Sequence, residues 1–158
     1  MFKLSEEGLA FVKKELTRYE IKNSAIIPCL FQVQKENDNW ISDDCISHLA
    51  EVMDIPESKI NEVFHFYTMF NKKPVGQFHI QVCCNISCAM NGGREIADHI
   101  RNTYGVKPGE VSADGQLSVI QVECLGSCGT APMMQVNDQY YENLTQDSAV
   151  ETLNKLAK

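Results

Sequence analysis

Two short loops hold five of the seven cysteines, and four of these form two spaced pairs, Cys83 and Cys88 in VCCNISC and Cys124 and Cys128 in ECLGSCG. Thiolate sulfur is a soft ligand, so paired cysteines favour zinc or an iron-sulfur cluster over cations that prefer oxygen. Each loop directly follows a short apolar run with the pattern of a β-strand. The sequence therefore predicts one metal site with four thiolate ligands.

The spacing of these cysteines leaves the kind of metal open. Zinc sites use cysteine pairs spaced C-x2-C to C-x4-C, often with a histidine ligand, and the two pairs here are C-x4-C and C-x3-C. Ferredoxin spacings bring three cysteines together, whereas each loop of this chain brings only two. Gly126 and Gly129 favour a 2Fe-2S cluster, because glycines let backbone amides approach sulfur and donate hydrogen bonds, although both residues also suit a plain turn.

Cys84 makes the ligand set ambiguous, because Cys84 and Cys88 would repeat the C-x3-C spacing of the second loop. Neighbouring side chains of a strand point to opposite faces, so Cys83 and Cys84 cannot both face the metal if the strand continues through them. One of these two thiols is therefore expected to be a bystander.

A strand, a helix and a second strand are expected to position the two loops. Residues 77–82 alternate apolar and polar side chains, as a strand with one buried face does, and residues 94–104 carry apolar side chains at helical spacing. Residues 116–124 form the second strand. The two strands of such a unit lie parallel, with a right-handed crossover, and therefore end at the same edge of a sheet. We expect both cysteine loops at that edge.

The remaining residues of this half complete the expected domain. Residues 131–136 and 139–143 predict two further strands joined by a tight turn at 137–138, and a final helix is expected from a cap near Thr145. The predicted fold class is α/β: an N-terminal helical bundle followed by a thioredoxin-like domain with a mixed four-stranded sheet. In that plan the loop at 124–128 replaces a connecting helix.

The first 75 residues predict four amphipathic helices. They are expected from Ser5 to Tyr19, from about 23–24 to the polar run at 35–39, from an N-cap at Ser42 to Met53, and within 54–70, with Pro56 at the first helical position. The linker NKKPVG at 71–76 separates this module, residues 1–75, from the second domain, residues 76–158. Because the helices carry no chemistry of their own, we expect a docking module.

The other cysteines and histidines of the helical module are expected to be packing or surface residues, because free cysteine is often a small buried hydrophobe. These residues are Cys29, Cys45, His48 and His65. The aromatic run FHFYTMF at 64–70 is the alternative feature of interest, since its exposed part could bind a partner.

Composition excludes several functions. The net charge of −7 and the absence of a long basic run argue against nucleic-acid binding. The N-terminus lacks the apolar segment of a secretory signal, and no stretch is apolar enough to insert into a bilayer, so we expect a cytoplasmic protein with reduced thiols. Thiol-disulfide catalysis is disfavoured because no C-x-x-C stands at a helix start to lower a thiol pKa.

The whole chain resembles the small thioredoxin-like 2Fe-2S subunit of NADH:quinone oxidoreductase, respiratory complex I, and the equivalent subunits of NAD-linked hydrogenases and formate dehydrogenases. The resemblance rests on the junction FHFYTMFNKKPVGQFHIQVC, the C-x4-C loop and ECLGSCGTAPMMQVND. It implies one 2Fe-2S cluster, with ligands at Cys83, Cys88, Cys124 and Cys128. Cys84 falls on a position that the family does not use as a ligand.

The resemblance also implies the setting of that cluster. Such a subunit carries single electrons beside a larger flavin-bearing subunit that binds NADH and FMN, and other iron-sulfur subunits complete the complex. The sequence contains no G-x-G-x-x-G, which is consistent with nucleotide and flavin sites on the partner. The chain is then expected to be an electron carrier within an oxidoreductase, peripheral on the inner face of the membrane, with no catalytic residues of its own.

Overall fold

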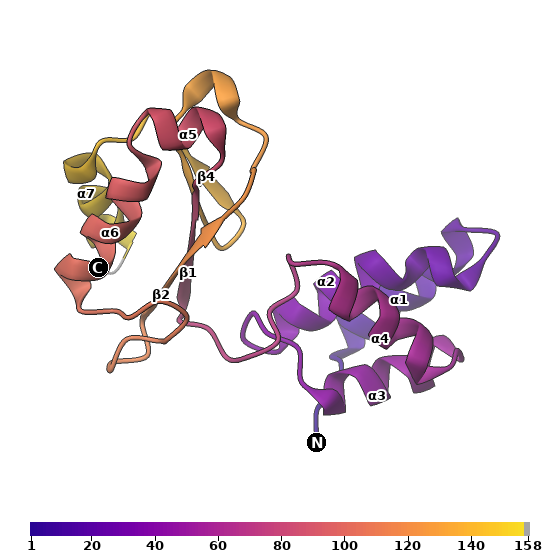
Figure 1. The fold of residues 1–158 in the computed structure, drawn as a ribbon. Helices are drawn as coiled ribbons and strands as arrows, with labels where there is room; N and C mark the ends of the chain where they lie inside the picture. Colours follow the sequence, from indigo (N-terminus) through magenta and orange to yellow (C-terminus); the bar gives the residue numbers. More distant parts are fainter. Residues whose placement is uncertain (157–158) are drawn as a thin grey trace. The chain divides into compact units, whose positions relative to one another are not determined.

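The computed structural model describes residues 1–156, which form two compact units that divide between Pro74 and Val75 (Figure 1). The division lies one residue before the boundary expected from the sequence. The expected fold class is confirmed, with a helical unit followed by a mixed four-stranded sheet flanked by helices. Within residues 1–156 no helix is long and apolar enough to cross a membrane.

Four α-helices build the first unit around one hydrophobic core that includes Leu30, Leu49 and Ile60. The helices are α1 (Glu6–Arg18), α2 (Ile26–Glu36), α3 (Asp43–Met53) and α4 (Glu57–Phe66), and a 3-10 turn, η1 (Lys22–Ala25), leads into α2. All four lie where the apolar periodicity predicts them.

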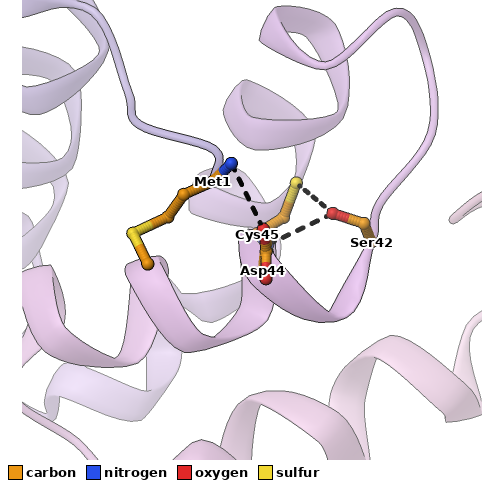
Figure 2. Close-up of polar contacts among 4 residues, drawn as sticks. All are labelled: Met1, Ser42, Asp44 and Cys45. Carbon is orange, nitrogen blue, oxygen red and sulfur yellow. Dashed lines mark hydrogen bonds and ion pairs between the residues drawn. The ribbon is translucent and has the colours of Figure 1, made fainter.

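Serine hydroxyls begin two of these helices, as the sequence indicates. The Ser5 Oγ atom accepts a hydrogen bond from the backbone N–H of Gly8 at 3.0 Å. At the start of α3, the Ser42 Oγ atom accepts from the Cys45 N–H at 3.4 Å, and the Ser42 hydroxyl lies 3.2 Å from the Cys45 sulfur (Figure 2). The N-terminal amine lies 3.6 Å from a carboxylate oxygen of Asp44, which stands in the first turn of the same helix. These contacts fix the first turn of each helix.

The prediction for Pro56 was wrong by one position. Pro56 is the N-cap of α4, with a ψ of 135°, and Glu57 is the first helical residue. Asp54 is left-handed, with a φ of 53°. Pro56 comes only two residues later and therefore still lies in the turn between α3 and α4. The helix ends at Phe66, so the rest of the aromatic run at 64–70 lies beyond it.

The histidines and the two cysteines of the first unit behave as packing or surface residues. Cys29 and Cys45 are fully buried in the core, and burial, together with the negative charge of Glu15, raises the pKa of Cys29 to about 12. The His48 ring packs edge-on against Phe2, whereas His65 is exposed and bonds to the backbone of its own helix.

The second unit is a four-stranded sheet in the order β2-β1-β3-β4. The strands are β1 (Phe78–Cys83), β2 (Leu117–Val122), β3 (Met134–Val136) and β4 (Gln139–Tyr141). As expected, β1 and β2 are parallel, and the register pairs Cys83 with Val122. Strand β3 runs antiparallel to both β1 and β4, which makes the sheet mixed.

Two helices, α6 (Gly93–Tyr104) and α7 (Gln146–Leu156), lie on the same side of the sheet (Figure 1). These two helices cover one face of the sheet. The core between helices and sheet includes Ile80 and Val82 of β1, Val119 of β2 and Ile100 of α6. Thr145 caps α7, since its Oγ1 atom accepts from the Ser148 N–H at 3.1 Å. The expected helix at the C-terminus is confirmed as far as Leu156.

The opposite face of the sheet is more buried than the alternation of residues 77–82 predicts. His79, on that face, is only 4% exposed, and its Nδ1 atom lies 2.8 Å from the Ser118 Oγ atom of β2. The Ser118 Oγ atom also accepts the N–H of Gly76. A polar residue at a strand position can therefore be buried when the adjacent strand supplies its partner.

Candidate metal centre

The parallel pairing of β1 and β2 brings the two cysteine loops to one edge of the sheet. Strand β1 ends at Cys83, but β2 ends at Val122, two residues earlier than the expected Cys124. Pairing continues past the strand ends, because the Cys84 N–H donates to the Val122 carbonyl at 2.9 Å and the Asn85 N–H donates to the Glu123 carbonyl at 3.2 Å. The loops therefore start side by side.

The first loop contains a short helix that the sequence did not indicate, α5 (Ile86–Met90). Its N-cap, Asn85, accepts the Ile86 N–H on its side-chain oxygen, and the helix carries Cys88 inward, where the side chain is 2% exposed. At five residues it gives too weak an apolar period to predict. Gly93 starts α6 so close to this loop that a Cβ atom there would lie 2.6 Å from the Cys83 carbonyl oxygen.

The second loop is shaped by Gly126. This residue has a φ of 83°, which glycine adopts readily, and its N–H points to the Cys124 sulfur at 3.4 Å. Cys128 follows at the start of a 3-10 turn, η2 (Cys128–Thr130). Gly129 has open space around it and lacks a positive φ, so only Gly126 fits the expectation of an amide that approaches sulfur.

The four thiols gather as two pairs. Burial raises the pKa of the Cys88 thiol to about 11, and a hydrogen bond with the Cys83 thiol adds to the rise. The charge of Cys124 and a hydrogen bond with its thiol raise the pKa of Cys128. The two pairs also affect each other, though more weakly. The charge of Cys128 raises the pKa of Cys88, and the charge of Cys83 raises the pKa of Cys128. All four expected ligand residues are therefore brought together.

This arrangement fits a 2Fe-2S cluster better than a single metal ion. Among residues 1–156, the Cys83–Cys88 pair and the Cys124–Cys128 pair together supply four cysteine sulfurs. A structural zinc ion needs four ligands around one point, whereas a four-cysteine 2Fe-2S cluster takes two sulfur ligands on each of two irons. The two thiol pairs match the second requirement.

The two pairs differ in their surroundings. Cys83, 4% exposed, and Cys88 pack against the fully buried Met133, whereas Cys124 and Cys128 are exposed. The Met133 backbone acts to lower the pKa of the Cys88 thiol, against the larger effect of burial, and the Met133 carbonyl accepts the Cys83 N–H at 3.2 Å. The Cys83–Cys88 pair is therefore shielded from water, whereas the Cys124–Cys128 pair is exposed to solvent and forms the open side of the site.

A hairpin holds the open side in place, and sequence reasoning missed the residues that do so. The Tyr140 hydroxyl donates to the Leu125 carbonyl at 2.9 Å. Glu142, just after β4, accepts from Ser127 and Thr130, the two hydroxyl residues that flank Cys128 and its turn. The expected hairpin at 131–143 is the only signal in the sequence that could have pointed to them, and it carries no information about which loop lies beside it.

A profile of the thioredoxin-like 2Fe-2S ferredoxin family matches residues 12–157, nearly the whole chain. The chain belongs to this family. Three relatives align over most of this thioredoxin-like 2Fe-2S ferredoxin. One of them, an NADH-quinone oxidoreductase subunit of Rickettsia bellii, is 38% identical over 98% of this chain and 94% of its own length.

The other two relatives come from other organisms. NADH-quinone oxidoreductase subunit 2 of Thermus thermophilus is 38% identical over 90% of this chain and 80% of its own length. NADH dehydrogenase [ubiquinone] flavoprotein 2, mitochondrial, of Dictyostelium discoideum is 36% identical over 98% of this chain and 64% of its own length. The resemblance drawn from the sequence motifs is thereby confirmed.

Solved structures of an NAD+-reducing NiFe-hydrogenase, in the air-oxidized and the H2-reduced states, share the fold of this ferredoxin. Each gives a TM-score of 0.68 at 19% sequence identity over 81% of this chain. The match spans 22% of the hydrogenase chain. At this identity the likeness supports the fold alone.

Proposed function

We propose that this chain is the electron-transfer subunit of the NADH dehydrogenase module of a respiratory complex I, holding one 2Fe-2S cluster on Cys83, Cys88, Cys124 and Cys128. The observation that carries the proposal is the convergence of two thiol pairs at one sheet edge, in a chain of the thioredoxin-like 2Fe-2S ferredoxin family. The relatives named as NADH-quinone oxidoreductase subunits support the choice of complex.

When bound, a 2Fe-2S cluster accepts and releases one electron at a time. The protein's part is to hold the sulfurs, to exclude water from one side and to set the local charge. Cys83 and Cys88 would anchor the buried side, and the backbone N–H groups of Gly126 and Met133 would donate to ligand sulfurs. Such hydrogen bonds stabilise negative charge on sulfur and are one lever on reduction potential.

The exposed pair defines the side from which electrons would enter. Cys124 and Cys128 face solvent, and the apolar side chains of Ile86 and Met90 beside the first loop are also exposed. An open sulfur pair lets a flavin-bearing partner approach closely. In this proposal the FMN and the NADH site belong to that larger partner, because this sequence has no dinucleotide-binding glycine motif.

The helical unit, residues 1–75, is proposed as a docking module for the same assembly, and residues 76–158 as the ferredoxin domain. Phe66, Tyr67 and Met69 leave apolar surface exposed at the end of α4 and after it. Other iron-sulfur subunits would complete the complex. The placement that follows is cytoplasmic and peripheral, on the inner face of the membrane, without insertion of this chain and without binding of nucleic acid.

Two other assignments remain as alternatives. The equivalent subunit of a soluble NAD-linked hydrogenase or formate dehydrogenase would use the same cluster in another complex. The fold shared with the NAD+-reducing hydrogenase is the observation that favours this alternative. A zinc-stabilised interaction module is the third assignment, and the match to a 2Fe-2S ferredoxin family argues against it.

Metal analysis of the purified chain tests the proposal directly. We expect two irons and two acid-labile sulfides per chain, and an electron paramagnetic resonance signal that appears only after reduction. A colourless protein with one zinc ion and no signal after reduction would contradict the proposal. Co-purification then separates the complexes, since recovery with membrane quinone-reductase subunits supports complex I and recovery with hydrogenase subunits contradicts it.

A further inference from the structure

One carboxylate oxygen of Glu142 accepts hydrogen bonds from two residues that lie on either side of Cys128 along the chain. Its Oε1 atom accepts hydrogen bonds from the Ser127 hydroxyl and, at 2.6 Å, from the Thr130 hydroxyl. Ser127 directly precedes Cys128, and Thr130 ends the 3-10 turn that Cys128 begins. The carboxylate therefore spans the turn that carries one expected ligand.

The backbone holds Glu142 at this position. The N–H of the next residue, Asn143, donates to the Thr130 carbonyl at 2.8 Å, and the Leu144 N–H donates to the Pro132 carbonyl at 3.0 Å. The segment after β4 thus runs alongside the segment after the loop. Because the backbone is already ordered here, the hydrogen bonds of Glu142 cost only the conformational entropy of its own side chain.

The chemistry of the three groups favours an ionised carboxylate. The Ser127 and Thr130 oxygens lie 2.8 Å apart, and each hydroxyl has only one proton to donate. A carboxylate oxygen has no proton of its own and enough lone pairs to accept both hydroxyl protons at once. The two hydroxyl bonds lower the pKa of Glu142, which agrees with a charged group at neutral pH.

We propose that Glu142 is a positioning residue of the metal centre, which fixes the turn around Cys128 and places a negative charge beside the cluster. This inference rests on the proposed function. The reduced cluster carries one more negative charge than the oxidised cluster, so a nearby carboxylate favours the oxidised form and lowers the reduction potential. Because Glu142 is exposed, salt should weaken the effect of its charge.

The two roles are separated by two substitutions in the full chain with its cluster. Glu142→Gln keeps an acceptor oxygen and the size of the side chain but removes the charge. Glu142→Ala removes both the charge and the hydrogen bonds with Ser127 and Thr130. Glu151→Gln on α7 is the matched control, because it removes the same charge from an exposed position on a helix outside the loop.

A redox titration followed by electron paramagnetic resonance, together with iron release to a chelator, tests the proposal. We expect Glu142→Gln to raise the reduction potential, more at low ionic strength than at high, while Glu151→Gln leaves it unchanged. We expect Glu142→Ala to release iron several-fold faster than the parent.

Two results would overturn the inference: a potential in Glu142→Gln equal to that of the Glu151→Gln control, or iron release from Glu142→Ala at the parent rate. Either result, in a parent protein that contains iron and sulfide, would leave the proposed function standing. A parent protein without iron and sulfide would overturn both.

Discussion

Cys83 and Cys84 are consecutive in the chain but belong to opposite sides of the sheet. Cys83 packs with Cys88 and Met133 in the small cluster at the metal centre. Cys84 packs against the core formed with α6 and α7, where the charges of Arg94 and Arg101 act on it. The alternation of the strand thus continues through its last residue and resolves the ambiguity that the spacing of the cysteines leaves.

Substitution of these two cysteines should therefore have unequal effects. We expect Cys83→Ser to lose the cluster, because hydroxyl oxygen is a poor replacement for a thiolate on iron. We expect Cys84→Ser to retain it, with iron and sulfide per chain close to the parent values. Iron and sulfide analysis of the purified variants measures the difference, and the opposite ranking would contradict the ligand assignment.

Gly93→Ala should disturb the first cysteine loop although residue 93 is not an expected ligand. The new methyl group would lie 2.6 Å from the Cys83 carbonyl oxygen and 2.9 Å from that of Cys88, and neither backbone atom can move freely. We expect a loss of about 1–3 kcal/mol in stability, as for overpacked positions, and a lower cluster content. Urea denaturation and iron analysis provide the measurements.

Gly129→Ala is the matched control for that substitution. It adds the same methyl group in the second loop, where no atom lies within 4 Å. A change in stability within about 0.5 kcal/mol is expected, as for other open surface positions. If Gly129→Ala were as damaging as Gly93→Ala, close packing against the loop would not be the cause.

The pH dependence of stability should carry a contribution from His79. Burial lowers the pKa of His79 to about 4, from an ordinary value of 6.5, so between these values the unfolded chain binds the extra proton. The buried neutral His79 therefore makes its full contribution to the free energy of unfolding above pH 6.5, and this contribution is lost as the pH falls toward 4. Between pH 7.5 and 5.5 the expected loss is about 1 kcal/mol.

Urea denaturation at several pH values measures this slope. His79→Gln should remove the His79 part of it, whereas His65→Gln, at an exposed position in the helical unit, should keep the parent slope. Equal slopes in the parent and in His79→Gln would show that the histidine is not buried in its neutral form.

Asn137 should be more sensitive to alanine than to glycine. It has a φ of 50°. Its side-chain oxygen accepts the backbone N–H of His79 at 2.9 Å, and its side-chain nitrogen donates to the Gln77 carbonyl at 2.9 Å. Asn137→Gly loses these two bonds, for about 1–3 kcal/mol, and Asn137→Ala adds the strain of a left-handed residue, for about 1 kcal/mol more. Thermal denaturation of both variants, beside Asp138→Ala as a surface control, should give this order.

Local patterns predicted the parts of the fold that depend on local chemistry. The apolar period located the helices of the first unit, and the hydroxyls of Ser5 and Ser42 marked their starts. The strand-helix-strand order also predicted that the cysteine loops would meet, since parallel strands end at one edge. These inferences use only spacing along the chain, which the sequence contains.

The missed features depend on partners that are distant in sequence. His79 lies at a polar position of its strand and is buried because Ser118, on the neighbouring strand, bonds to its ring. Glu142 follows the short strand β4 and gives no sign in the sequence that Ser127 and Thr130 lie next to it. Alternation and turn signals do not encode such contacts, because they arise from the register between strands.

The pairing of β1 with β2 also determines the order in which this protein can be assembled. The two thiol pairs come from loops separated by a helix and a strand, and only the sheet brings them together. The proposed metal centre is therefore complete only in a chain whose sheet has formed, whereas the ligands of a zinc finger lie close together along a short segment. For the proposed cluster, we expect iron and sulfide to enter from the side on which Cys124 and Cys128 are exposed.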